Sequence, residues 1–252
     1  MASILVIYAG GTLGMVPGAH GLQPGGDFES RLRQAVMRLP PARQASLPDF
    51  ALLEYAHPID SSSAVPSDWQ GLARDIASRY DAYAGFVVLH GTDTLAWTAS
   101  SLAFQLQGTG KPVIITGAQK PLEADASDAL DNIEAALRFA TRPELQEVAV
   151  CFGGKLLRGC RTRKWETQAF EAFVSPNYPL LGEIVDHDAI LYASRGLERQ
   201  RRGAPRFELP DLAALPASPV VRIALWPGIT ARQIENWLQD CLLYTSPSPR
   251  DS

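Results

Sequence analysis

Short apolar runs alternate with longer amphipathic segments along the first 152 residues of the chain. The runs are short enough to be strands buried on both faces of a sheet, and the segments between them repeat their apolar residues at helical spacing. Alternating strands and helices predict an α/β fold with a doubly wound, mainly parallel sheet. The expected strands are Ile4–Ala9, Phe50–Ala56, Phe86–Leu89, Pro112–Thr116 and Glu147–Phe152.

The helices expected between these strands are marked by caps, breakers and apolar stripes. One runs from Asp27 to Leu39 and stops at the pair Pro40-Pro41. The next begins near Ser67, whose spacing to Gln70 is that of a capping box. Two further helices are indicated by apolar stripes: Leu95, Ala99, Leu102 and Leu106, then Leu130, Ile133, Leu137 and Ala140.

After the fifth strand the composition changes, and the change predicts a domain boundary. Residues 188–219 are rich in Arg, Pro and Ala and are expected to be a linker after a first domain at 1–187. Residues 220–240 contain a buried-type strand and the beginning of a helix, so we expect only the start of a second, smaller α/β domain. The Ser/Pro-rich stretch 241–252 breaks this pattern and is expected to be a non-native tail.

Charge and cysteine content narrow the class of protein. The 252 residues carry a net charge of -4, which gives no basis for expecting nucleic acid or a membrane as a partner. The three cysteines lack CxxC spacing and the four histidines are scattered, so neither a disulfide framework nor a metal site is predicted, and no cofactor is expected. Because the chain enters its first strand without a basic leader, a cytoplasmic location is expected.

The residues that follow the third strand are the strongest candidates for chemistry. The turn His90-Gly91-Thr92-Asp93-Thr94 places hydroxyls and a carboxylate at the carboxyl end of a parallel strand, where open α/β sheets bind ligands. A turn without a functional role would more often contain Gly, Asn and Ser. The alternative is that Asp93 and Thr94 only cap the helix that follows.

The first strand ends in a glycine-rich turn, Gly10-Gly11-Thr12-Leu13-Gly14. A dinucleotide site would need GxGxxG opening directly into a helix, whereas a loop, Met15–Gly21, follows here. The nucleotide interpretation is therefore weak. We expect instead a mobile loop that carries the hydroxyl of Thr12 over the sheet edge, with a simple tightening of the turn by Thr12 as the alternative.

Polar groups also follow the remaining strands. The run Asp60-Ser61-Ser62-Ser63 suits a zwitterionic ligand, because hydroxyls donate to its carboxylate and Asp60 accepts from its ammonium group; an ordinary polar turn is the alternative. The turn Gly117–Pro121 could direct backbone amides at a developing oxyanion. One lysine in the cationic stretch Arg158–Trp165 could serve as a base or proton relay if it lay near Asp93.

Taken together, these motifs resemble the bacterial-type L-asparaginase family, most closely its cytoplasmic type I branch. The likeness extends over nearly everything from Ile4 to Gln239, and the Gly-Gly-Thr and His-Gly-Thr-Asp-Thr motifs are its most specific part. The matching stretches are Gly10–Gly14, Asp60–Ser62, His90–Thr94, Gly117–Gln119 with Pro121, and Arg161–Lys164. By this likeness, residues 1–187 would be the N-terminal catalytic domain.

The resemblance implies an amidohydrolase that converts L-asparagine to L-aspartate and ammonia through a threonine acyl-enzyme. An acyl-enzyme replaces one difficult step of amide hydrolysis with two easier ones. Thr12 would be the nucleophile. Thr92, Asp93 and Lys164 would form a second catalytic set, in which Lys164 draws a proton from Thr92 or from water. The resemblance leaves open which threonine attacks first.

The same resemblance assigns the groups that hold the substrate. Asp60 and Ser61 would bind the α-amino and α-carboxylate groups of L-asparagine, and backbone groups at Gly91 and Ala118 would frame the reacting amide. Family members continue into a full C-terminal domain that builds a homodimer or a dimer of dimers and completes the site. Turnover by the present residues alone is therefore not expected.

Three departures from the family pattern stand out. Ala9 replaces a threonine that is not the nucleophile, and this change is expected to be harmless. Leu22 lies where several members carry a tyrosine that assists the nucleophile, which puts the activation of Thr12 in question. Arg163 and Trp165 replace small residues beside Lys164 and are expected to narrow that side of the pocket.

Two other functions remain open at this point. One is a glutaminase or another amidohydrolase of the same family, for which ammonia release from L-glutamine would be comparable to that from L-asparagine. The glutaminase component of a tRNA amidotransferase is less favoured, because such relatives carry an extra N-terminal domain. The second is a catalytically inactive fragment that binds an amino acid, although binding alone needs no nucleophile.

Overall fold

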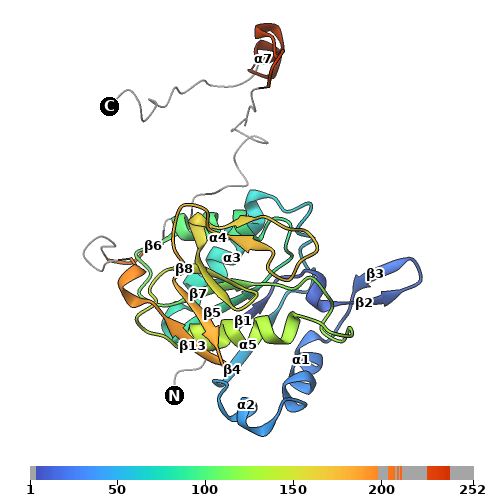
Figure 1. Ribbon diagram of the computed structural model, residues 1–252, viewed down its shortest axis with the longest axis vertical. Helices are drawn as coiled ribbons and strands as arrows, with labels where there is room; N and C mark the ends of the chain where they lie inside the picture. Colours follow the sequence, from blue (N-terminus) through green and yellow to red (C-terminus); the bar gives the residue numbers. More distant parts are fainter. Residues whose placement is uncertain (1–3, 198–203, 208, 210, 212–225, 239–252) are drawn as a thin grey trace. The chain divides into compact units, whose positions relative to one another are not determined.

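The computed structural model describes residues 4–197, 204–207, 209, 211 and 226–238. The chain divides into two units, Met1–Pro210 and Asp211–Ser252, and the two are described separately. Every element of the sheet and of the candidate site belongs to the first unit (Figure 1).

An eight-stranded sheet forms the centre of the first unit, in the order β13-β12-β9-β8-β7-β5-β1-β4. The strands from β8 to β4 pair in parallel with their neighbours. The expected α/β fold with a mainly parallel sheet is thus confirmed, and each of the five strands expected in the first 152 residues is present. The parallel strands are β1 (Ile4–Tyr8), β4 (Phe50–Glu54), β5 (Gly85–Leu89), β7 (Val113–Thr116) and β8 (Val148–Phe152).

Helices cover both faces of this sheet (Figure 1). On one face, α1 (Phe28–Met37) and α5 (Ala129–Ala140) contribute to a core that includes Val6; on the other, α3 (Pro66–Ser78) and α4 (Leu95–Gln105) contribute to a core that includes Ile7. Alternate residues of β1 therefore enter opposite cores. Because neither face is open to water, the parallel strands read as continuous apolar runs.

The other edge of the sheet is antiparallel, which the sequence pattern did not indicate. It consists of β9 (Lys155–Arg158), β12 (Gly182–Val185) and β13 (Asp188–Leu191). The expected linker 188–219 thus begins inside the sheet. These strands are short and partly exposed, so they show no continuous apolar run.

A second difference concerns the segment after the first glycine-rich turn. A loop was expected there, and the structure instead has a hairpin of β2 (Met15–Gly18) and β3 (Gly21–Pro24) that projects from the body of the first unit (Figure 1). All of β3 is exposed. A hairpin that buries neither face lacks the apolar alternation by which strands are recognised.

The helix expected near Ser67 begins one residue earlier, at Pro66, and its capping residues differ from those expected. The Asp68 carboxylate accepts a hydrogen bond from the Val65 amide at 2.8 Å. Pro66 favours this start, because it lacks an amide hydrogen and its fixed φ suits the first helical position.

The remaining short elements are α2 (Pro41–Ala45), β6 (Leu106–Gln107), β10 (Arg163–Lys164), β11 (Phe173–Val174), β14 (Arg206–Phe207) and 3-10 turns at Thr12–Gly14, Tyr80–Ala82, Gly159–Arg161 and Ala193–Arg195.

In the second unit, the structure describes Trp226–Leu238 and includes a helix, α7 (Ala231–Leu238), within the span where one was expected. The Trp226 and Trp237 rings pack with their centroids 5.7 Å apart. The strand expected at Val220–Trp226, apart from Trp226 itself, and the tail 241–252 lie outside the described residues. Among the described helices, none has the length and hydropathy needed to cross a membrane.

Candidate active site

The turns that follow β1 and β5 pack backbone against backbone. A Cβ added to Gly11 would lie 2.5 Å from the Gly91 nitrogen, and Gly11 also has a φ of 99°, which disfavours any side chain. A Cβ on Gly91 would in turn collide with Ser61 Oγ in the turn after β4. The glycines therefore let three turns meet at the carboxyl edge of the sheet, where Thr12, Thr92 and Ser61 come together.

Lys164 reaches this edge from a distant part of the chain. Its ammonium group donates hydrogen bonds to Thr92 Oγ1 and to Asp93 Oδ1, each at 2.9 Å. The Lys164 side chain is 19% exposed, whereas the Asp93 carboxylate is 58% exposed. The arrangement links a nearly buried hydroxyl, an ammonium group and a carboxylate in one hydrogen-bonded chain, through which a proton can be transferred.

Pairing with a buried strand holds Lys164 in this position. Residue 164 pairs with Phe173 across the antiparallel β10–β11 ladder. The Phe173 ring packs edge-on against Phe152 of β8 with centroids 4.9 Å apart, and both rings are buried. Hydrophobic burial of β11 thus fixes the strand that carries the lysine.

The hydroxyl of Thr12 is not used to close its own turn. The 3-10 turn Thr12–Gly14 is closed by backbone groups, with the Gly14 amide donating to the Gly11 carbonyl at 3.2 Å. The Leu122 amide donates to the Leu13 carbonyl at 2.9 Å and ties this turn to the segment after β7. Within the described residues, Thr12 Oγ1 has no hydrogen-bond partner, which speaks against a purely structural role.

His90 fixes the turn that carries Thr92. Its Nδ1 lies 2.8 Å from the Gly91 carbonyl, to which it must donate, so Nε2 accepts from Thr98 Oγ1 at 3.1 Å. Burial lowers the pKa of His90, and the bond to Gly91 opposes this only in part. The neutral imidazole is therefore a rigid link between the turn and α4.

The turn after β4 has the internal bonds of an ordinary polar turn and is joined to the turn after β5. Asp60 Oδ1 accepts from the Ser62 amide and hydroxyl, each at 2.9 Å, as in an ordinary polar turn. Thr94 Oγ1 donates to the Ser61 carbonyl at 2.8 Å and makes no cap bond to α4. The alternative in which Asp93 and Thr94 only cap that helix is therefore wrong: Asp93 binds Lys164, and Thr94 joins two turns of the site.

The turn that contains Ala118 is held from α5. The Asp128 carboxylate accepts from the amides of Gln119 and Lys120 at 3.0 to 3.1 Å, and Asn132 Nδ2 donates to the Gly117 carbonyl at 3.0 Å. Two of the amides expected to face an oxyanion are thus occupied, and that expectation fails for them. Ala118 itself is buried at the same sheet edge.

Comparison with known proteins adds a second line of evidence. Residues 3–196 match the family described as Asparaginase, N-terminal. The chain belongs to the asparaginase family. Its motif residues at Thr12, Thr92, Asp93 and Lys164 all lie within the matched range.

Individual relatives in this asparaginase family are similar over most of the chain. L-asparaginase 1 of Escherichia coli K12 is 40% identical over 239 residues, which cover 94% of this chain and 67% of the relative. The crystal structure of L-asparaginase I from Vibrio cholerae matches with a TM-score of 0.79 and 37% identity, over 94% of this chain and 68% of that one. A structure named "Probable Cytoplasmic L-asparaginase", from Campylobacter jejuni, matches with a TM-score of 0.67 and 29% identity, over 76% and 59%.

The departures from the asparaginase pattern can be placed in the structure. The Arg163 guanidinium lies over the Trp165 ring at 5.5 Å, and both side chains are exposed. Because successive strand residues point to opposite faces, Arg163 points away from the side of β10 that carries the Lys164 ammonium group. The expected narrowing of the pocket is therefore not seen. Leu22 lies on the exposed strand β3 and is 51% exposed.

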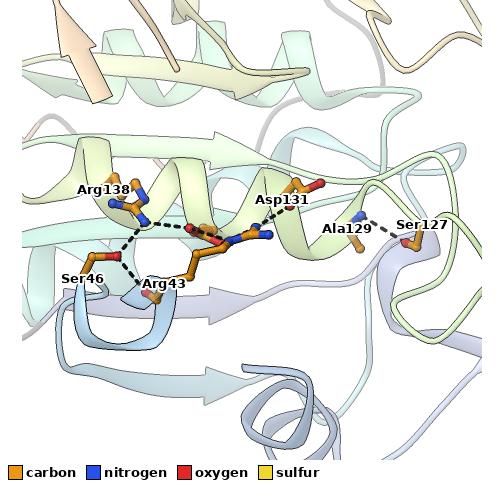
Figure 2. Close-up of polar contacts among 7 residues, drawn as sticks. Arg43, Ser46, Ser127, Ala129, Asp131 and Arg138 are labelled. Atoms are coloured by element: carbon orange, nitrogen blue, oxygen red, sulfur yellow. Dashed lines mark hydrogen bonds and ion pairs between the residues drawn. The ribbon is translucent and has the colours of Figure 1, made fainter. Parts of the chain in front are cut away.

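A separate polar cluster lies on the outer side of α5, beside a cleft of about 580 Å³. Arg43 and Arg138 both bind the Glu134 carboxylate, at 2.6 and 2.7 Å, and Arg43 also binds Asp131; Figure 2 shows these bonds, with Ser46 beneath Arg138. Burial raises the pKa of Glu134, but the two guanidinium groups outweigh it and the net shift is downward. These charges balance one another, so we assign the cluster to stability.

Proposed function

We propose that this chain carries the catalytic residues for hydrolysis of L-asparagine to L-aspartate and ammonia through a threonine acyl-enzyme. The observation that carries the proposal is the hydrogen-bonded set of Thr92, Lys164 and Asp93 beside the turn of Thr12. Membership of the asparaginase family and the similarity to named L-asparaginases support the choice of substrate.

In the first step, Thr12 Oγ attacks the side-chain amide carbon of L-asparagine and loses its proton. The carbon–nitrogen bond breaks, and the leaving amine takes up the proton given up by Thr12 and departs as ammonia, which leaves an aspartyl ester on Thr12. In the second step, a water molecule attacks the ester and gives a proton to Thr92 Oγ1, which passes its own proton to Lys164 as the neutral amine. The ester bond breaks, the proton returns to Thr12, and L-aspartate is released.

The turn after β4 supplies the groups that would hold the substrate. Asp60 would accept from the α-ammonium group with the help of Asp93, and Ser61 would donate to the α-carboxylate. Backbone groups at Gly91 and Ala118 would frame the reacting amide. Gly91 and Ala118 are buried and lie on the turns after β5 and β7, next to the threonines along the sheet edge.

The proposal extends to assembly and location, which family membership supports. We place the catalytic residues in the first unit and expect a homodimer, or a dimer of dimers, for the full protein in the cytoplasm. The Campylobacter jejuni relative's name supports the location. The present chain spans about two thirds of the Escherichia coli relative.

The test is ammonia release from L-asparagine and from L-glutamine by the purified chain, with the Thr12→Ala variant as control. If the chain releases ammonia from L-asparagine, that release is expected to disappear in the control. Release that persists in Thr12→Ala would remove Thr12 from the mechanism. If L-glutamine were hydrolysed as fast as L-asparagine, the glutaminase alternative would replace the proposed substrate.

Absence of release from the present chain has a specific follow-up. The same assay is then run on this chain extended with the C-terminal domain of the Escherichia coli relative, which supplies the third that the alignment does not cover. Activity in the extended protein would support the proposal. Calorimetric binding of L-aspartate without any hydrolysis in that protein would favour an amino-acid-binding fragment instead.

A further inference from the structure

Arg31 of α1 lies at the base of the β2–β3 hairpin and contacts both of its ends. Its Nη1 donates to the Gly14 carbonyl at 2.9 Å, and its Nη2 lies 3.5 Å from the Met15 carbonyl, where the hairpin begins. At the other end, the Gly25 amide donates to the same Gly14 carbonyl at 3.1 Å, and a Cβ on Gly25 would collide with the Arg31 guanidinium. One cationic group therefore closes the hairpin base.

Glu123 holds the guanidinium in this orientation. Its two carboxylate oxygens accept hydrogen bonds from Arg31 Nε and Nη2, each at 2.7 Å. This bidentate geometry fixes the orientation of the guanidinium plane relative to the carboxylate. The Arg31 side chain is 17% exposed, so most of it is shielded from water. The Phe28 ring packs beneath the guanidinium, with its centroid 6.0 Å from Arg31 Cζ.

The same contacts reach the proposed nucleophile. Gly14 is the last residue of the 3-10 turn that begins at Thr12, and Met15 follows it directly. Glu123 follows Leu122, whose amide donates to the Leu13 carbonyl. The Arg31–Glu123 pair thus connects the residues after Thr12 to the segment after β7, which carries Ala118. Beyond this base the hairpin projects from the body of the first unit (Figure 1).

We propose that Arg31 and Glu123 form a positioning clamp, which fixes the base of the β2–β3 hairpin and thereby sets the place of the Thr12 hydroxyl for attack. The proposal rests on the proposed function for its catalytic part. Neither residue is a catalytic residue, since both act through the backbone of Gly14 and Met15. The clamp resists movement at the base of the hairpin, while strand β3 beyond it is exposed to solvent.

The first test separates turnover from substrate binding. Glu123→Gln keeps the shape of the side chain but removes its charge, and Arg31→Lys keeps the charge but removes the bidentate geometry. We expect each to lower kcat for L-asparagine about 10-fold with KM changed less than about threefold, because the substrate-holding turn is untouched while the nucleophile is displaced. Arg33→Ala is the matched control on the same helix, where an exposed pair with Glu29 is lost. An unchanged kcat in both variants would overturn the clamp.

The second test needs no activity and therefore separates failure of the clamp from failure of the proposed function. Thermolysin cleavage of the Gly21–Leu22 bond reports opening of the hairpin, and trypsin has no site between residues 15 and 30 and so serves to monitor the rest of the fold. We expect Glu123→Gln to raise the initial cleavage rate at least about threefold and Arg33→Ala to leave it unchanged. If cleavage were equal in Glu123→Gln and the parent chain, the clamp would be refuted even if kcat had fallen. If the parent chain released no ammonia, this rate alone would decide the clamp.

Discussion

The ammonium group of Lys164 lies 2.9 Å from Thr92 Oγ1, although the two residues are 72 positions apart in the chain. The contact joins the short β10 strand to the turn after β5, and a second bond of equal length continues to Asp93. A partly shielded lysine that donates to both groups is placed to exchange a proton with the Thr92 hydroxyl. The two hydrogen bonds therefore define a path for proton transfer between Thr92 and Lys164.

Replacing Lys164 tests that relationship. Lys164→Met keeps much of the apolar stem and removes the ammonium group, so we expect kcat for L-asparagine to fall by about 10³-fold, within the range for loss of acid–base catalysis. Circular dichroism and the thermal midpoint are measured alongside ammonia release. Lys155→Met, which removes an exposed lysine paired with Glu171, is the control for loss of a lysine. Near-parental activity of Lys164→Met would exclude the lysine from the mechanism.

The close approach of two glycines makes a steric prediction. Gly11→Ala places a Cβ 2.5 Å from the Gly91 nitrogen and at a φ of 99°, so we expect it to lower the free energy of unfolding by about 1–3 kcal/mol and to abolish turnover. Gly26→Ala meets no atom within 4 Å and should leave both quantities unchanged. Urea denaturation and ammonia release measure the two effects. A fully active Gly11→Ala would show that the two turns are not in contact.

The ion pairs on the outer side of α5 predict a pH dependence of stability. The folded pKa of Glu134 is lowered by Arg43 and Arg138, so the unfolded chain binds the proton more tightly. The stabilisation is therefore present above the ordinary value of 4.5 and is lost as the pH falls through the folded pKa. We expect Glu134→Gln to cost about 3 kcal/mol at pH 7, and the difference from the parent to shrink below pH 4.5.

Urea denaturation at pH 7, 5 and 3 measures this effect, with Glu29→Gln as the control because Glu29 makes only an exposed pair with Arg33. Surface pairs of that kind contribute about 0–1 kcal/mol. If the loss in Glu134→Gln were constant from pH 7 to pH 3, the ionised carboxylate would not be the source of the stabilisation.

The two described cysteines should differ sharply in reactivity. Cys151 lies inside β8 with no exposed surface, and burial raises the pKa of its thiol to about 12. Cys160 is exposed at the turn after β9. We expect a maleimide to modify Cys160 in the native chain and Cys151 only in denaturant, since the thiolate is the reactive form. Peptide mapping by mass spectrometry assigns each adduct, and rapid native labelling of Cys151 would contradict the placement of β8.

The sequence alone determined the parallel part of the fold and the polar turns at its edge. Strands buried on both faces must be apolar throughout, so β1, β5, β7 and β8 could be recognised from their runs, and the alternation with helices set their direction. Once the strands are parallel, their carboxyl ends meet at one edge of the sheet. That rule placed Thr92 and Asp93 at a ligand-binding edge, and the resemblance to the asparaginase family implied that Thr12 and Asp60 belong to the same site.

Elements that bury little surface were not predictable in the same way. The β2–β3 hairpin and the antiparallel strands β9, β12 and β13 are short or exposed, and neither period nor length separates them from loops. The capping residues of α3 were predicted wrongly for a local reason, because Pro66 begins the helix one residue before the expected Ser67.

Only the tertiary structure decided which distant residues touch. The sequence identified the cationic stretch around Lys164, but its contact with Thr92 depends on burial of Phe173 against Phe152, which holds β10 through its partner strand. The Arg31–Glu123 pair spans 92 positions and has no local pattern at all. Local sequence sets the spacing of apolar residues along each strand and helix, and the residue types in each turn. Contacts between residues this far apart in the chain arise only when the apolar faces of the elements pack together. That packing then decides which polar groups lie next to one another.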